Sequence, residues 1–217
     1  MNIDFVYLIV VLGVVLISMT LHEAMHAYAG YWLGDDTAKL SGRLSLNPIK
    51  HIDPFLTILL PLLLAISGAP IFGAAKPVPF NPNNIRWDEW GAALLALAGP
   101  LTNLLLAFLI FGLSVILGNP VTMTGSASGI DGLVLTVGVM VNLGFFIFNL
   151  IPIPPLDGSR VLYALAPDFV RRGMESMERY GIIVVFALIL IGGSAFSTFL
   201  IGSISFFIQL FAHIFGV

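Results

Sequence analysis

Long apolar stretches separated by polar connections dominate the hydrophobic pattern of this chain. The three strongest stretches lie at residues 5–33, 89–118 and 131–158. Because about 20 apolar residues are enough for a helix to cross a bilayer, we predict that these stretches form a three-helix core. Residues 181–215 are also apolar, with a break at Gly192 and Gly193. They predict either one span plus an interfacial helix or two short spans.

The connection between the first two stretches contains one apolar and two extended segments. Residues 54–68 are apolar but short, so we predict an accessory helix that either re-enters the membrane or crosses it while residues 69–80 thread back. Prolines recur at alternate positions in residues 74–82, which excludes a helix and indicates extended backbone. Residues 43–48 also read as extended. We predict that the two extended segments pair as a small membrane-associated β-hairpin.

The composition supports a membrane protein. Of 217 residues, 58% are hydrophobic and 10% are charged, whereas soluble domains carry about 25% charged residues. We therefore predict an all-α polytopic membrane protein: a single domain over residues 1–217, built as a bundle of about five to six transmembrane or re-entrant helices. The net charge of −3 offers no basic footprint for nucleic acid. The absence of cysteine excludes disulfides and thiolate metal ligands.

The motif His22-Glu23-Ala24-Met25-His26 lies near the end of the first span. Two histidines four residues apart share one face of a helix, so both imidazoles can reach one metal ion. HExxH on a helix is the zinc-protease pattern. Glu23 lies roughly 100° around the helix from His22, where it can act as a general base on a water at the metal. Such a short pattern also recurs by chance, but its apolar setting favours a metal as the compensating partner.

The lysines and arginines predict the orientation of the chain. All of them lie in the polar connections after the first span, before the second span and after the third span, and residues 119–131 contain none. By the positive-inside rule, the end of the bundle that carries the HExxH motif faces the cytoplasm, and the N-terminus faces outward. Residues 1–4 lack the positive region of a signal peptide, so we expect the first span to be retained in the cell membrane.

Asp157 is the candidate for a third metal ligand. Two histidines and a water leave a tetrahedral zinc ion one ligand short. Asp157 follows a run broken by Pro152, Pro154 and Pro155, and it lies on the same side of the membrane as the HExxH motif by the arginine count. The alternative is an aspartate at the membrane edge that caps a turn, and this would be the more common case for Asp157 taken alone.

These motifs together resemble the site-2 protease family of intramembrane zinc metalloproteases. The matching segments are His22–His26, Gly99-Pro100-Leu101-Thr102-Asn103 and Asn149–Gly158, and the resemblance extends from about residue 5 to 165. Many members carry a PDZ domain, for which this chain leaves no room. We therefore expect a short member of the family that lacks this domain.

The resemblance implies a ligand set and two catalytic residues. One zinc ion per chain would be held by His22, His26 and Asp157, with Glu23 activating the water. Asn149 would donate hydrogen bonds to the substrate or to the developing oxyanion. Asn149 could instead satisfy backbone groups freed by the broken helix. Asn103 could likewise contact the substrate or form a helix–helix hydrogen bond.

We therefore expect a zinc metalloprotease that hydrolyses peptide bonds within or near transmembrane segments of other membrane proteins. Residues 43–48 and 76–82 are candidates for an edge that holds an unwound substrate. One alternative is a metal transporter, because intramembrane His and Asp also mark ion pathways; another is an inactive scaffold that binds helices. Glu23 is surplus to metal ligation, which disfavours both alternatives. We expect His51 to be a surface residue.

Overall fold

The computed structural model describes residues 5–59, 75–121 and 129–217. The described residues contain seven α-helices: α1 (Phe5–Trp32), α2 (Thr37–Leu40), α4 (Asp88–Ile116), α5 (Gly129–Asn149), α6 (Gly158–Leu165), α7 (Asp168–Glu178) and α8 (Gly181–Phe215). Four are long and apolar enough to cross a membrane: α1, α4, α5 and residues Ile183–Phe215 of α8. The prediction of a helical multi-pass membrane protein is confirmed, and each predicted core span contains one long helix.

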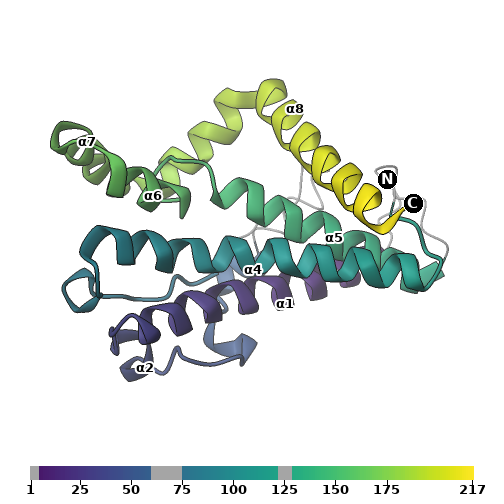
Figure 1. Ribbon diagram of the computed structural model, residues 1–217, viewed down its shortest axis with the longest axis horizontal. Helices are drawn as coiled ribbons and strands as arrows, with labels where there is room; N and C mark the ends of the chain where they lie inside the picture. The colour runs from purple at the N-terminus through teal and green to yellow at the C-terminus, as the bar shows by residue number, and fades with distance from the viewer. Residues whose placement is uncertain (1–4, 60–74, 122–128) are drawn as a thin grey trace.

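The core consists of α1, α4 and α5, which all contact one another. Figure 1 shows these helices running along the long axis of the molecule, with α6 and α7 at one end. Small residues lie where the helices meet, because Ala24 and Ala27 of α1 and Ala107 of α4 are fully buried. In a lipid environment such residues allow close backbone approach, which is a main source of helix association.

The first helix ends as its sequence predicts. Gly34 adopts a φ of +104°, a conformation that favours glycine, and the Asp35 N–H donates to the Gly30 carbonyl. Asp35 is only 2% exposed, and its carboxylate accepts hydrogen bonds from Thr37, from the Asn81 N–H (2.7 Å) and from Asn84 Nδ2 (3.2 Å). These bonds fix the end of α1 to the segment that precedes α4.

The predicted β-hairpin is wrong, because neither extended segment forms a strand in the described residues. The two segments do lie side by side. The Lys76 N–H donates to the His51 carbonyl (3.0 Å), and the Arg43 guanidinium donates to the carbonyls of Lys50, Lys76 and Pro77. The N–H of Lys76 bonds to His51 and that of Val78 bonds to Glu23, so neither pairs with residues 43–48, and the Arg43 side chain joins the two segments.

His51 departs from the expectation, whereas only the first part of the predicted accessory helix at residues 54–68 lies in the described residues. His51 is 2% exposed, and its Nε2 lies 2.7 Å from the Ser45 carbonyl, so the expected surface position is wrong. This carbonyl satisfies Nε2, whereas Nδ1 is buried without a hydrogen-bond partner in the described residues. The described part of the predicted accessory helix, Pro54–Leu59, is a single π-helical segment. Residues 60–74 lie outside the described residues, so the two predicted paths of this region stay predictions.

The last helix is bent at the predicted position. Gly193 has non-helical backbone angles (φ 45°, ψ −125°), and α8 continues on both sides of it. Figure 1 shows the two arms of α8 meeting at a sharp bend, with the second arm returning toward the end of α4. That arm carries Phe211 and Phe215, which pack against Phe108 and Phe111 of α4. Aromatic contacts therefore hold α8 on the core.

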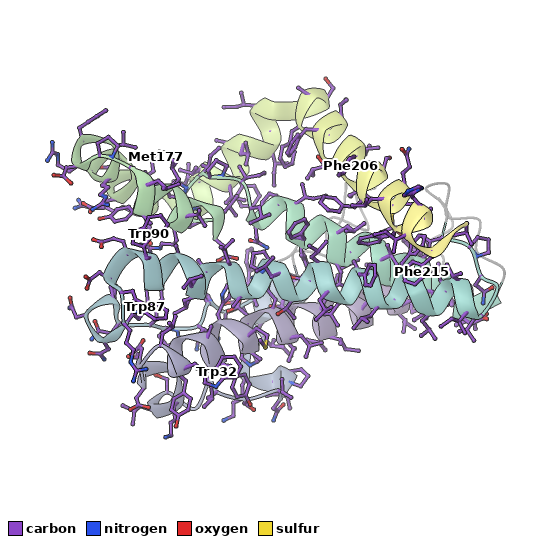
Figure 2. All side chains as sticks on the ribbon, in the orientation of Figure 1. Trp32, Trp87, Trp90, Met177, Phe206 and Phe215 are labelled. Atoms are coloured by element: carbon purple, nitrogen blue, oxygen red, sulfur yellow. The ribbon has the colours of Figure 1, made fainter. Side chains whose placement is uncertain are left out.

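Aromatic side chains also mark one end of the bundle. Figure 2 shows Trp32, Trp87 and Trp90 toward the end at which α6 and α7 lie. All three are more than half exposed. Tryptophan is enriched where a membrane protein meets the membrane–water interface, so this end has the character of an interfacial belt.

Candidate metal centre

The structure brings together the three predicted metal ligands. His22 and His26 lie one turn apart on α1, and Asp157 lies immediately before α6. Asp157 Oδ2 is 3.2 Å from His22 Nε2 and 3.4 Å from His26 Nε2, and the two Nε2 atoms are 3.0 Å apart. One ligand atom from each residue thus lies within 4.8 Å of the other two, an arrangement that could hold a metal ion.

The polarity of these atoms fits a cation. The Leu95 carbonyl lies 2.8 Å from His26 Nδ1. A carbonyl only accepts hydrogen bonds, so Nδ1 of a neutral His26 carries the hydrogen and Nε2 carries a lone pair. Asp157 Oδ2 is buried and has no hydrogen-bond partner among the described residues. Buried acceptors without donors are costly, and nitrogen and oxygen ligands of this kind suit zinc.

Gly99 allows α4 to approach the two histidines. A Cβ atom at this position would lie 2.4 Å from His26 Nε2 and 2.6 Å from His22 Nε2, which is far inside van der Waals contact. Only glycine leaves space for both imidazoles and for an ion beside them. The sequence reasoning assigned no role to Gly99, although its place in Gly99-Pro100-Leu101-Thr102-Asn103 was the available signal.

One face of α4 contacts both imidazoles. Leu95, Gly99 and Asn103 are spaced four residues apart and therefore share a face of the helix. Asn103 Oδ1 lies 2.6 Å from His22 Nδ1, just as the Leu95 carbonyl faces His26 Nδ1. Zinc-binding histidines commonly donate their second N–H to a carbonyl or carboxylate in this way. The helix–helix interpretation of Asn103 is thus confirmed.

Glu23 lies beside the ligands but is not one of the three. It is half-buried, and its Oε2 accepts a hydrogen bond from the Val78 N–H at 3.0 Å. Val78 lies between Pro77 and Pro79, which have no N–H, in the extended segment that precedes α4. The extended segment therefore borders the carboxylate that is predicted to act as the general base.

Asn149 is the last residue of α5, and the turn that follows it carries Asp157. Asn149 Nδ2 donates to the Phe145 carbonyl at 3.0 Å, so the structural interpretation of this amide has a described bond. Its predicted contact with substrate stays a prediction. Gly158 is needed in the turn, because a Cβ atom there would lie 2.2 Å from the Leu150 carbonyl oxygen.

Comparisons with known proteins place these observations in a family. The model of "Peptidase family M50" matches residues 117–192. The chain is 42% identical over 184 residues to the "Putative zinc metalloprotease YwhC" of Bacillus subtilis, covering 84% of this chain and 79% of that protein. It is 30% identical over 186 residues to the "Putative zinc metalloprotease Rip2" of Mycolicibacterium smegmatis, covering 85% and 68%. No solved structure matches. The chain belongs to peptidase family M50, the site-2 protease family of zinc metalloproteases.

Proposed function

We propose that this M50 metalloprotease binds one zinc ion through His22, His26 and Asp157 and cleaves peptide bonds within or near transmembrane segments of other membrane proteins. The observation that carries the proposal is the convergence of three ligand atoms within 4.8 Å, with Glu23 beside them. A zinc ion held there supplies Lewis-acid activation of water and of a peptide carbonyl. The ligands reach it from α1 and from the turn before α6.

Glu23 acts as the general base. Its carboxylate accepts a proton from the water that attacks the scissile carbonyl carbon, and it returns a proton to the leaving nitrogen as the C–N bond breaks. The Val78 N–H holds one carboxylate oxygen of Glu23, which fixes the orientation of the group. The amide of Asn149 donates a hydrogen bond to the substrate or to the oxyanion.

The extended segment before α4 lines the path of the substrate. A helix hides its peptide bonds, so a transmembrane substrate must unwind before it is cleaved. Residues 75–81 are non-helical and contact Glu23 through Val78. They are also tied to the connection that contains residues 43–48 through Arg43. An unwound substrate that runs beside this backbone would pass the general base.

The chain acts as a single domain in the cell membrane, with the metal site toward the cytoplasm and the start of α1 outside. The positions of the lysines and arginines support this orientation. The metal transporter is disfavoured, because no second group of three metal-ligating side chains is found in the described part of the chain. An ion pathway would need such groups along the membrane.

Cleavage of a model transmembrane substrate by purified protein in lipid nanodiscs tests the proposal. The wild-type protein should cleave it, and a zinc chelator should abolish cleavage. Glu23→Gln should retain zinc and lose roughly 10²–10⁴-fold in rate, which is the range for a general base. Full activity of Glu23→Gln, or full activity in the metal-free protein, would contradict the proposal.

A further inference from the structure

A chain of buried polar side chains runs from Ser18 through Asn142 and Asn103 to His22 and joins the three core helices. Ser18 and His22 lie one turn apart on α1, Asn103 lies on α4 and Asn142 lies on α5. None of the four is more than 7% exposed, and the two asparagines are 0% and 1% exposed. Buried amides are costly unless their hydrogen bonds are satisfied. We refer to Ser18, Asn142 and Asn103 as the relay.

The direction of the relay is set by a backbone carbonyl. Asn142 Nδ2 lies 2.8 Å from the Gly138 carbonyl and 2.9 Å from Ser18 Oγ. Because the carbonyl can only accept, the NH₂ group of Asn142 must face it, and Asn142 Oδ1 must face Asn103. Asn103 Nδ2 donates to that oxygen at 2.8 Å and also faces the Ser18 backbone carbonyl at 3.5 Å. The oxygen of Asn103 is therefore left to face His22.

This order decides which nitrogen of His22 carries the hydrogen. Asn103 Oδ1 accepts from His22 Nδ1 at 2.6 Å, so the Nε2 lone pair of a neutral His22 faces Asp157. If the Asn103 amide rotated by half a turn, its NH₂ group would face Nδ1. The hydrogen of His22 would then move to Nε2, and this nitrogen could no longer bind a metal ion.

The two histidines differ in how their tautomers are fixed. His26 Nδ1 faces the Leu95 backbone carbonyl, which cannot reverse its polarity. His22 Nδ1 faces the side-chain amide of Asn103, and an amide can rotate to present its NH₂ group in place of its oxygen. We propose that Asn142 is a positioning residue of the zinc site, which acts through Asn103 to keep His22 in the tautomer that binds metal. This inference rests on the metal-binding part of the proposed function.

The test is the zinc dissociation constant of the purified full-length protein, measured by competition with a chelating dye. Asn142→Leu removes the closer of the two acceptors of the Asn103 amide and leaves only the Ser18 carbonyl at 3.5 Å, so zinc affinity should fall by about 10- to 100-fold, the usual effect of losing an outer-shell partner. The visible absorption of the cobalt-substituted protein should change as well, because the His22 ligand is affected. Ser114→Ala is the matched control. Ser114 is fully buried on α4, and its hydroxyl donates to the Phe111 carbonyl within the same helix.

Repeating Asn142→Leu in a protein that also carries Asn103→Asp separates a role in positioning His22 from a general structural role. In Asn103→Asp, the carboxylate has only acceptors, so it holds the N–H of His22 without help from Asn142. Asn142→Leu should therefore lower zinc affinity by less than about threefold in this background, since the coupling is removed. An equal loss in both backgrounds, or no loss in either, would overturn the proposal.

If Asn142→Leu does not fold, Asn142→Ala carries the same test. It removes the same acceptor of the Asn103 amide, so it should weaken zinc binding in the wild-type background and not with Asn103→Asp. Equal affinities of Asn142→Ala and wild type would overturn the relay. The wild-type measurement keeps the two proposals apart. Failure of the wild-type protein to bind zinc would defeat the proposed function, whereas normal zinc binding by Asn142→Leu would defeat the relay alone.

Discussion

The two halves of α4 pack against the molecule in different ways. Its first half meets α1 through a glycine, a backbone carbonyl and a buried amide, at Gly99, Leu95 and Asn103. Its second half meets α8 through phenylalanine rings, with centroids 5.2–5.9 Å apart between Phe108 or Phe111 and the rings of α8. One helix therefore carries a directional polar contact at one end and an apolar contact at the other.

The first half of α4 therefore serves the metal site, and the second half holds α8 on the core. A hydrogen bond depends on its angle and on which atom donates and which accepts. The first half of α4 can therefore set the orientation of the two imidazole rings. Ring packing tolerates small shifts, and lipid tails offer contacts of similar quality, so the second half holds α8 with less specificity. Changes to the first half should alter metal binding, and changes to the second half should alter stability alone.

The largest expected effect is that of Gly99→Ala. The added methyl group would lie 2.4–2.6 Å from the two ligand nitrogens, so zinc affinity should fall by more than about 100-fold, beyond the usual outer-shell effect. Chelator competition measures it. Gly144→Ala on α5 is the control, because a Cβ atom there meets nothing within 4 Å. If the zinc affinities of Gly99→Ala and Gly144→Ala agreed within error, the first half of α4 would not shape the metal site.

Phe211→Ala should weaken the attachment of α8 without changing the metal site. Phe211 is 4% exposed and packs against Phe108 and Phe111. We expect a loss of about 1–3 kcal/mol in the free energy of unfolding, less than in a water-soluble core because lipid replaces some contacts. Denaturant unfolding in detergent measures this, with the exposed Phe206→Ala as control. A loss of zinc affinity in Phe211→Ala would show that the two halves of α4 are coupled.

The smallest expected effect concerns Asp35, which lies outside both contacts of α4. Burial opposes ionisation of Asp35, but hydrogen bonds from Thr37, Asn81 and Asn84 outweigh it and lower its pKa below the ordinary 3.8. A lowered folded-state pKa stabilises the fold above the unfolded-state pKa, and this contribution is lost as the pH falls through the folded-state value.

Thermal unfolding from neutral pH to pH 2.5 measures the contribution of Asp35. Asp35→Asn should be less stable than wild type at neutral pH, and the two proteins should converge in acid. Zinc affinity at neutral pH should be unchanged, since Asp35 contacts none of the metal ligands in the described residues. Parallel unfolding curves at every pH would show that Asp35 does not stabilise the fold through its charge.

Much of the architecture could be predicted because membrane spans depend on local composition. The three core spans and the break at Gly193 follow from hydropathy and from glycine alone. The convergence of His22, His26 and Asp157 could also be predicted, since His22 and His26 share a helical face and Asp157 follows a broken span. Spacing within a helix and position relative to the membrane are both visible in one sequence.

Contacts between helices could not be predicted in the same way. The roles of Gly99 and of the Leu95 carbonyl depend on how α4 is rotated against α1, which hydropathy does not encode. A backbone carbonyl also carries no signal in its residue type. The β-hairpin was predicted from extended character, but the N–H groups of Lys76 and Val78 bond to the His51 carbonyl and to Glu23 and not to residues 43–48. His51 was placed on the surface because its connection is polar, and its carbonyl partner was not visible in the sequence.

The zinc K-edge X-ray absorption spectrum of the purified protein tests the central claim most directly. The account predicts one zinc ion per chain, with two imidazole nitrogens at about 2.0–2.1 Å and carboxylate or water oxygen at about 2.0–2.2 Å. In Asp157→Asn the carboxylate contribution should be lost and zinc should bind more weakly. A protein that binds no zinc, or one whose spectrum lacks two imidazoles, would contradict the assignment of His22, His26 and Asp157 as the metal site.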